Sequence, residues 1–239
     1  MGGDRSRVTE PVGPPRGGRP KAVVSWSSGK DAALALHEVV RAGELDVVGL
    51  LTTVTGPFAR VSMHGVRREL LTRQARALRL PLREVEIPSP CPNSVYEEAM
   101  GRAVARLRSE GVERIVFGDL FLEEIRRYRE EKLAGSGVAP VFPLWGRPTR
   151  ALAEEMVNLG LAAHLVCLDP RKLAKAFAGR VFDRSLLDEL PAGVDPCGEN
   201  GEFHTCVTDL PEFHAPIPVR VGPVVERDGF VFADLIPGR

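Results

Sequence analysis

The sequence contains no apolar run that approaches the roughly 20 residues needed to span a bilayer. Its first residues also lack the apolar centre of a secretory signal, because glycine, proline and arginine interrupt them. We therefore expect a cytoplasmic protein without a membrane partner. Residues 1–20 are too polar and too broken to pack strongly, so we predict a disordered tail there.

The sequence also has little charge imbalance and few cysteines. Its formal net charge is +0 at pH 7, so it has no general attraction for nucleic acid or for an anionic surface. Its four cysteines are scattered along 239 residues, a length that does not depend on disulfide bonds. We therefore expect no nucleic-acid partner, and any anion must be bound locally.

Apolar segments bounded by turns alternate with segments of helical period from residue 21 onward. The expected strands are 21–26, 46–53, 83–88 and 113–118, and the expected helices between them include 66–80 and 94–111. One face of the 66–80 helix carries Val66, Leu70, Leu71, Gln74 and Leu78. This alternation predicts an α/β fold with a Rossmann-like parallel sheet and helices on both faces.

The pattern changes after Leu133, and we place a soft domain boundary there. The stretch GSGVAPVFPLWGRPT is rich in turn residues, and a helix at 151–160 and a strand at 162–168 follow it. Beyond the polar loop at 195–206, Asp228-Gly229 between alternating segments predicts a β-hairpin. Residues 135–239 are thus expected to form a smaller α+β region.

The stretch KAVVSWSSGKDAALAL leads from the end of a strand into a helix. Unpaired backbone amides and the helix dipole favour an anion at such a loop, and Lys30 adds a full positive charge. The loop matches neither a Walker A motif nor a G-x-G-x-x-G motif. A simple turn with a helix cap remains an alternative explanation.

Gly118 and Asp119 follow the strand expected at 113–118. Ligands of open α/β sheets lie at this edge, so Asp119 is a candidate to face a nucleotide or its metal. Asp119 acting only as a helix cap is an equally good interpretation of the local sequence. The charged run that follows is by default a solvated helix face. This run contains Arg126, Arg127, Arg129 and Glu130.

The stretch DPCGENGEFHTC is polar and rich in glycine, so it can bring carboxylates and amides close to a ligand. Its histidine and cysteines match none of the paired spacings of zinc sites, and we predict no metal site. These residues are Cys197, His204, Cys206 and, further on, His214. His64 follows the second expected strand, either as a site residue or as a surface histidine.

Residues 27–32 resemble the S-G-G-K-D-S loop of the PP-loop ATP pyrophosphatases at four of six positions. Ser28 replaces a glycine, which ordinary backbone torsions would tolerate, and Ala32 lacks the hydroxyl of the final serine. Together with PLWGRPT and the CGENGEF version of a C-G-E-x-G-E-[FY] signature, the stretch from Lys21 to Phe213 resembles the diphthine ammonia ligase family.

This resemblance implies a HUP-type fold with a PP-loop ATP-binding domain at 21–134 and a substrate-binding region at 135–239. It implies ATP and Mg²⁺ as cofactors, cleavage of ATP to AMP and pyrophosphate through an acyl-adenylate, and an amide product. With no glutaminase segment visible, free ammonium is the expected nitrogen source. A diphthine-bearing elongation factor is the implied protein partner, and the sequence leaves open whether the chain forms a homodimer.

The resemblance also implies the site residues. The implied catalytic residues are Lys30, Asp119, Glu199 and Glu202. The implied nucleotide-binding residues are Ser25, Ser27, Ser28, Gly29, Lys30, Asp31, Ala32, His64, Gly118 and Asp119. The implied substrate-binding residues are Arg127, Glu130, Glu199, Asn200, Gly201, Glu202, His204 and Thr205. Two alternatives are a non-catalytic binder of ATP or AMP and another AMP-forming enzyme, such as one that modifies tRNA.

Overall fold

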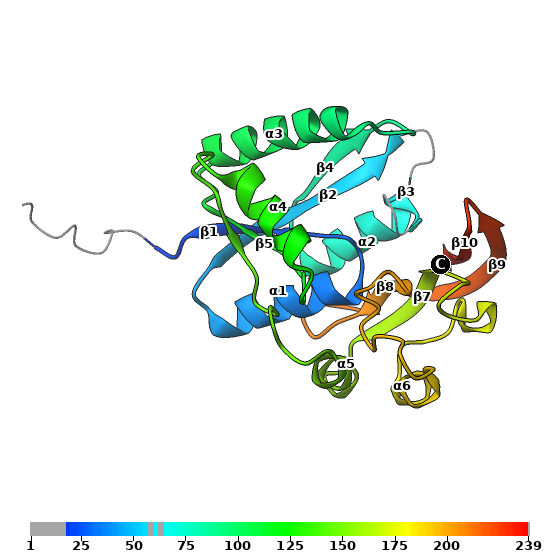
Figure 1. Ribbon diagram of the computed structural model, residues 1–239. Helices are drawn as coiled ribbons and strands as arrows, with labels where there is room; N and C mark the ends of the chain where they lie inside the picture. The colour runs from blue at the N-terminus through cyan, green and yellow to red at the C-terminus, as the bar shows by residue number, and fades with distance from the viewer. Residues whose placement is uncertain (1–17, 57–59, 62–64, 239) are drawn as a thin grey trace, which may run out of the picture.

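The computed structural model describes residues 18–56, 60, 61 and 65–238. Two sheets and their covering helices make up this part of the chain (Figure 1). Most of the tail predicted at 1–20 lies outside the described residues, and so does His64. None of the helices in the described ranges is both long enough and apolar enough to cross a membrane.

The first sheet has the strand order β3-β2-β1-β5-β6, and β4 pairs with β2. All neighbouring strands in it run parallel except β3, which is antiparallel to β2. The strands are β1 (Lys21–Ser25), β2 (Asp46–Thr55), β3 (Arg60–Val61), β4 (Leu82–Ile87), β5 (Arg114–Val116) and β6 (Ala139–Val141). The predicted Rossmann-like parallel sheet is confirmed.

Helices cover both faces of this sheet, as predicted. The helices are α1 (Lys30–Ala42), α2 (Arg68–Leu78), α3 (Asn93–Ser109) and α4 (Glu123–Leu133). Val24 of β1 packs in one apolar cluster with α1 and α2, whereas its neighbour Val23 packs in a second cluster with α3 and α4. Alternate residues of a strand face opposite sides of the sheet, which explains why β1 is apolar throughout.

The second sheet has the antiparallel order β8-β7-β10-β9. Its strands are β7 (Ala162–Leu168), β8 (Phe203–Asp209), β9 (Val219–Arg227) and β10 (Phe230–Pro237). Asp228 and Gly229 join the last two with φ values of 52° and 81°, the positive torsions that a two-residue hairpin turn requires. The hairpin prediction is confirmed.

Three further helical elements flank the second sheet. They are α5 (Thr149–Asn158), the short 3-10 helix η2 (Lys175–Phe177) and α6 (Arg184–Glu189). Leu152 of α5 and Phe203 of β8 share one apolar cluster with α1 and α2. The second sheet therefore packs on the α1 and α2 side of the first sheet (Figure 1), and a single core joins the two parts of the chain.

The structure differs from the sequence-based expectations in two places. The stretch predicted to be only turn-rich contains β6, which extends the first sheet beyond residue 134 by pairing with β5. The loop predicted at 195–206 ends earlier, because Phe203 already begins β8. Pairing with β7 and burial of Thr205 and Cys206 make this polar stretch a strand. The division of the chain at residue 135 stays a prediction.

Candidate functional site

The loop that links β1 to α1 lies at the carboxyl edge of the first sheet, between Ser25 and Lys30. No side chain of this loop caps α1 at its Gly29 cap position. Instead, the first amide of the helix, that of Lys30, donates to Oγ1 of Thr205 at 3.1 Å. The second sheet thus supplies the cap of the helix that the sequence predicted to bind phosphate.

Ser28 occupies the left-handed region, with φ 71°. Its carbonyl oxygen accepts a hydrogen bond from the Val207 amide at 2.9 Å. Its side chain is fully buried, and the hydroxyl has no hydrogen-bond partner among the described residues. The condition under which a serine would be tolerated here, ordinary backbone torsions, is therefore not met, because this position has the conformation that favours the glycine of the related motif.

Lys30 is 1% exposed and extends into the interior between the two parts of the chain. Its ammonium donates to both carboxylate oxygens of Asp31 at 2.9 Å and to the carbonyl oxygen of Cys197. It also lies 5.5 Å and 5.3 Å from the ring centroids of Phe182 and Phe203. Burial alone would lower the pKa of Lys30, but the attraction of Asp31 outweighs it and the pKa lies above its ordinary value.

Gly118 and Asp119 lie where the sequence predicted, at the carboxyl end of β5, after Phe117. A Cβ on Gly118 would lie 2.7 Å from the carbonyl carbon of Asp31 and 2.8 Å from the amide nitrogen of Ala32. Only glycine lets this edge approach the first turn of α1 so closely. The carboxylate of Asp119 is bound by the guanidinium of Arg129, with Nη2 to Oδ1 at 3.0 Å.

Glu199 connects the loop at 195–202 to the same edge. Its Oε1 accepts a hydrogen bond from the Leu120 amide at 2.9 Å. Burial raises the pKa of Glu199 to about 7, because it outweighs the hydrogen bond from the Leu120 amide and the positive charge of Lys30, which both lower this pKa. The nearby carboxylates of Asp31 and Asp119 add to the rise. A carboxyl group with a pKa of about 7 is suited to accepting and releasing a proton at physiological pH.

Glu202 is buried and organises its own loop. Its Oε1 accepts hydrogen bonds from the amide of Asp195 at 3.1 Å and from Nδ2 of Asn200 at 3.2 Å. Oδ2 of Asp195 in turn accepts a hydrogen bond from the amide of Glu199 at 2.8 Å, and the amide of Gly201 donates to the carbonyl of Gly198. The loop is therefore a hydrogen-bonded unit that holds Glu199 in place.

His204 projects from β8 into a hollow at the ends of β2 and β4. Thr55, Ser89 and Arg227 also line this hollow, whose volume is about 350 Å³. Burial lowers the pKa of His204, and the positive charge of Lys30 lowers it further, to about 4. The imidazole is therefore neutral at physiological pH.

Some of the predicted residues lie apart from this constellation. Arg127 is exposed on α4, and Glu130 is exposed and paired with Arg126 at 2.8 Å, as expected for a solvated helix face. Ser25 ends β1 beside Leu51, and Ala32 is buried in the first turns of α1. His64 lies outside the described residues.

The cysteines and histidines of the C-terminal region do not assemble into a metal centre. Nδ1 of His214 lies 2.9 Å from the carbonyl of Ala77, and Cys197 donates to the carbonyl of Thr149. Within the described ranges, no group of three or more histidine, cysteine, aspartate or glutamate side chains is arranged to hold a metal ion.

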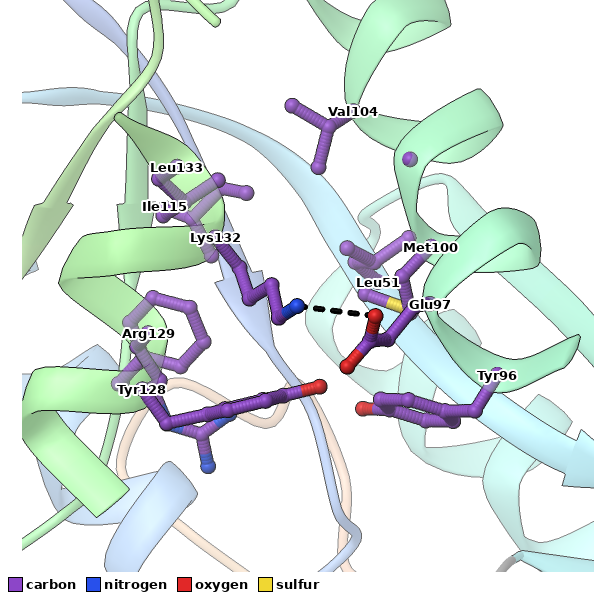
Figure 2. Close-up of a pocket in the computed structure, with 12 residues that line it drawn as sticks. Leu51, Tyr96, Glu97, Met100, Val104, Ile115, Tyr128, Arg129, Lys132 and Leu133 are labelled. Atoms are coloured by element: carbon purple, nitrogen blue, oxygen red, sulfur yellow. Dashed lines mark ion pairs between the residues drawn. The ribbon is translucent and has the colours of Figure 1, made fainter. Parts of the chain in front are cut away.

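A separate pocket lies between α3 and α4 on the other face of the first sheet (Figure 2). Tyr96 and Tyr128 point toward one another at its rim, and Lys132 reaches across to Glu97 at 2.9 Å. Its floor is apolar, with Leu51 and Ile115 among the lining residues. The rim ion pair is largely exposed, so it contributes little to the stability of the helices. This pocket contains none of the residues predicted for the site.

Sequence reasoning missed three residues that shape the site. Asp195 and Gln74 are buried polar residues that hold loops in place, and Arg129 binds Asp119. The polar side chain of Gln74 on an otherwise apolar helix face is the one sequence signal that could have indicated a buried hydrogen-bonding role.

Comparisons with known proteins point to one family. The model of the diphthamide synthase N-terminal domain matches residues 20–139, and the model of the diphthamide synthase C-terminal domain matches residues 148–230. The diphthine-ammonia ligases of Bos taurus and Homo sapiens are each 28% identical to this chain, in an alignment that covers 87% of this chain and 85% of theirs.

Proposed function

The chain belongs to the diphthamide synthase family of ligase enzymes, and from this premise we propose that it is an ATP-dependent amide-forming ligase of diphthamide synthesis. It cleaves ATP to AMP and pyrophosphate through an acyl-adenylate and passes the acyl group to ammonia. The contacts of the loop at 195–202 with the carboxyl edge of the first sheet carry the proposal. Lys30, which follows β1, donates to the carbonyl of Cys197, and Glu199 accepts from the amide of Leu120, which follows β5.

The pyrophosphate of ATP binds against residues 27–31 in this proposal. Amides at a helix N-terminus and the helix dipole favour an anion, and the close approach of Gly118 keeps the carboxyl edge of β5 beside them. Because Lys30 is buried, its charge acts on the phosphates through the loop, and no swing of its side chain into solvent is required. Ala32 offers no hydroxyl, so the backbone carries the binding.

Mg²⁺ enters the proposal as an ion that accompanies ATP. The described carboxylates do not form a protein cage for it, because Asp31 is paired with Lys30 and Asp119 with Arg129. Mg²⁺ is often held mainly by phosphate oxygens, and when so bound it neutralises charge on them. The roles proposed for the side chains below do not depend on a resident metal.

The reaction proceeds in two displacements. A carboxylate oxygen of the acceptor attacks the α-phosphorus, the bond to the β-phosphate oxygen breaks, and pyrophosphate leaves. Ammonia then attacks the acyl carbon, AMP leaves with the bonding electrons, and one proton is released as the amide forms. Glu199, with a pKa of about 7, is the group proposed to hold an ammonium ion and to take the proton that converts it to ammonia, while the proton released as the amide forms passes to solvent.

The C-terminal part supplies the acceptor side of the site. We propose that residues 21–134 bind ATP and that residues 135–239 bind a diphthine-bearing elongation factor in the cytoplasm. Asn200, Gly201 and Glu202 shape the loop that carries Glu199, while His204 adds a neutral imidazole. Most of the catalysis comes from positioning and electrostatics.

An isotope experiment tests this function. The full chain is incubated with ATP, Mg²⁺, a diphthine-bearing elongation factor and either ¹⁵N-ammonium or ¹⁵N-amide glutamine, and the acceptor is analysed by mass spectrometry. We expect label from ammonium only, and a loss of amide formation with retained ATP binding in Glu199→Gln. Incorporation from glutamine alone, or no incorporation with any acceptor, contradicts the proposal.

A non-catalytic nucleotide-binding protein is the second candidate. The burial of Lys30 and the missing hydroxyl at Ala32 favour it, because both reduce direct assistance to the leaving phosphates. ATP binding without release of pyrophosphate across a broad set of acceptors is the result expected of such a binder.

A further inference from the structure

Gln74 is a fully buried polar residue in the middle of α2. Its neighbours on the inward face of the helix, such as Leu70 and Leu71, are apolar core residues. A buried primary amide is costly unless its donors and acceptor are satisfied. Gln74 meets this requirement with hydrogen bonds that reach outside its own helix.

The three strongest contacts of Gln74 fix the orientation of its amide group. Oε1 accepts from the indole nitrogen of Trp26 at 2.9 Å, and Nε2 donates to the carbonyls of Val207 at 2.7 Å and of Ser28 at 3.2 Å. An indole N–H can only donate and a carbonyl can only accept, so the opposite orientation of the amide would break every contact.

The hydrogen bond from Gln74 to Ser28 orients a peptide of the loop proposed to bind phosphate. Two donors hold the Ser28 carbonyl, namely Nε2 of Gln74 and the amide of Val207. In a trans peptide the carbonyl and the following amide point in opposite directions, so the amide of Gly29 points away from Gln74 and Val207. It lies 3.3 Å from Oγ of Ser27, a long contact that leaves the amide available to a stronger acceptor.

The conformation of Ser28 explains why the following peptide needs hydrogen bonds from other elements to keep its orientation. A serine with φ 71° is in a region that costs a non-glycine residue energy, and its hydroxyl has no hydrogen-bond partner among the described residues to offset that cost. We propose that Gln74 is a positioning residue for nucleotide binding: it holds the peptide between Ser28 and Gly29 so that the Gly29 amide faces the phosphate oxygens. This inference rests on the proposed function.

The substitution Gln74→Met tests the inference because it keeps most of the volume and removes all three contacts. We expect the dissociation constant for ATP, measured by calorimetry on the full chain, to rise about tenfold, which corresponds to the loss of one hydrogen bond in the bound state. In the ligase assay the KM for ATP rises while kcat changes less. An unchanged dissociation constant overturns the inference.

Trp26→Phe is the matched control. It removes the indole donor and so destabilises the same cluster, but it leaves both carbonyl contacts of the Gln74 amide in place. We expect urea unfolding to show a loss of stability for both variants, and weakened ATP binding only for Gln74→Met. Equal weakening in both variants assigns Gln74 a purely structural role and contradicts the inference.

Gln74→Glu covers the case in which Gln74→Met does not fold. A glutamate accepts from Trp26 but lacks donors when ionised, and it regains one donor when protonated. Its ATP affinity relative to wild type should therefore improve as the pH falls, and a constant ratio contradicts the inference. If wild type binds ATP but releases no pyrophosphate, the proposed ligase activity fails while the effect of Gln74 on binding remains measurable.

Discussion

The amide of Lys30 donates a hydrogen bond to the hydroxyl of Thr205, a residue 175 positions later in the chain. This bond caps α1 from the second sheet, so the loop before α1 is shaped by both parts of the chain. Thr205→Val removes the acceptor at nearly constant volume and should lower the free energy of unfolding by about 1 kcal/mol. Urea unfolding measures this loss of free energy. The control variant Thr205→Ser keeps the hydroxyl and should retain most of the stability. Equal losses in the two variants contradict the capping role.

The contact between Gly118 and α1 predicts a steric effect. A methyl group on Gly118 meets backbone atoms of Asp31 and Ala32, which cannot rotate away. Gly118→Ala should therefore cost about 1–3 kcal/mol of stability and weaken ATP binding by displacing the loop. Gly101→Ala on α3 is the control, since its added Cβ meets no atom of the described part of the chain within 4 Å and should stabilise the helix by up to about 1 kcal/mol. Thermal unfolding measures the stability of both variants relative to wild type. A Gly118→Ala protein as stable as wild type would contradict the close packing of Gly118 against α1.

Ser28→Gly should stabilise the protein. The substitution relieves the left-handed conformation, about 1–2 kcal/mol, and removes a buried hydroxyl that has no partner among the described residues. The greater freedom of glycine in the unfolded chain offsets up to about 1 kcal/mol of this gain. We expect a net gain of about 1 kcal/mol in urea unfolding. Ser27→Gly, which loses the acceptor for the Gly29 amide, should instead lose stability. Reduced stability of Ser28→Gly would contradict this account.

Glu199 predicts a pH dependence of stability. Its pKa of about 7 in the folded protein exceeds the ordinary carboxyl value, so the folded state binds the proton more tightly than the unfolded state does. Its contribution to stability is therefore complete below about pH 4.3 and is lost as the pH rises through about 7. Relative to wild type, Glu199→Gln should gain stability over this range. Unfolding curves at about pH 5 and about pH 8 measure the difference in free energy of unfolding between the two proteins. An equal pH dependence of stability in both would contradict the raised pKa of Glu199.

The sequence predicted the fold well where periodicity is strong. The buried valines of β1 and the apolar face of α2 gave clear signals, and the Asp228-Gly229 turn gave the hairpin. β6 was missed because it has only three residues, one of them Pro140, and its pairing with β5 decides its conformation. β8 was mistaken for loop because its polar residues are satisfied by partners that local sequence does not reveal.

The candidate site was predictable in position more than in detail. Gly118 and Asp119 follow a parallel strand, and the rule for ligands at carboxyl edges suffices to place them. The burial of Lys30 depends on Cys197, Phe182 and Phe203, which are distant in sequence. The conformation of Ser28 likewise depends on long-range hydrogen bonds. These contacts arise from tertiary packing, which local sequence does not encode, and only the glycine that the related motif has at position 28 matches the left-handed torsion found there.

The fate of the phosphates of ATP tests the central claim most directly. The full chain is allowed to amidate a limiting amount of diphthine-bearing elongation factor, and nucleotides and phosphates are then quantified by chromatography. The account predicts one AMP and one pyrophosphate for each amide formed, with no ADP. Formation of ADP and orthophosphate, or of the amide without consumption of ATP, would contradict it.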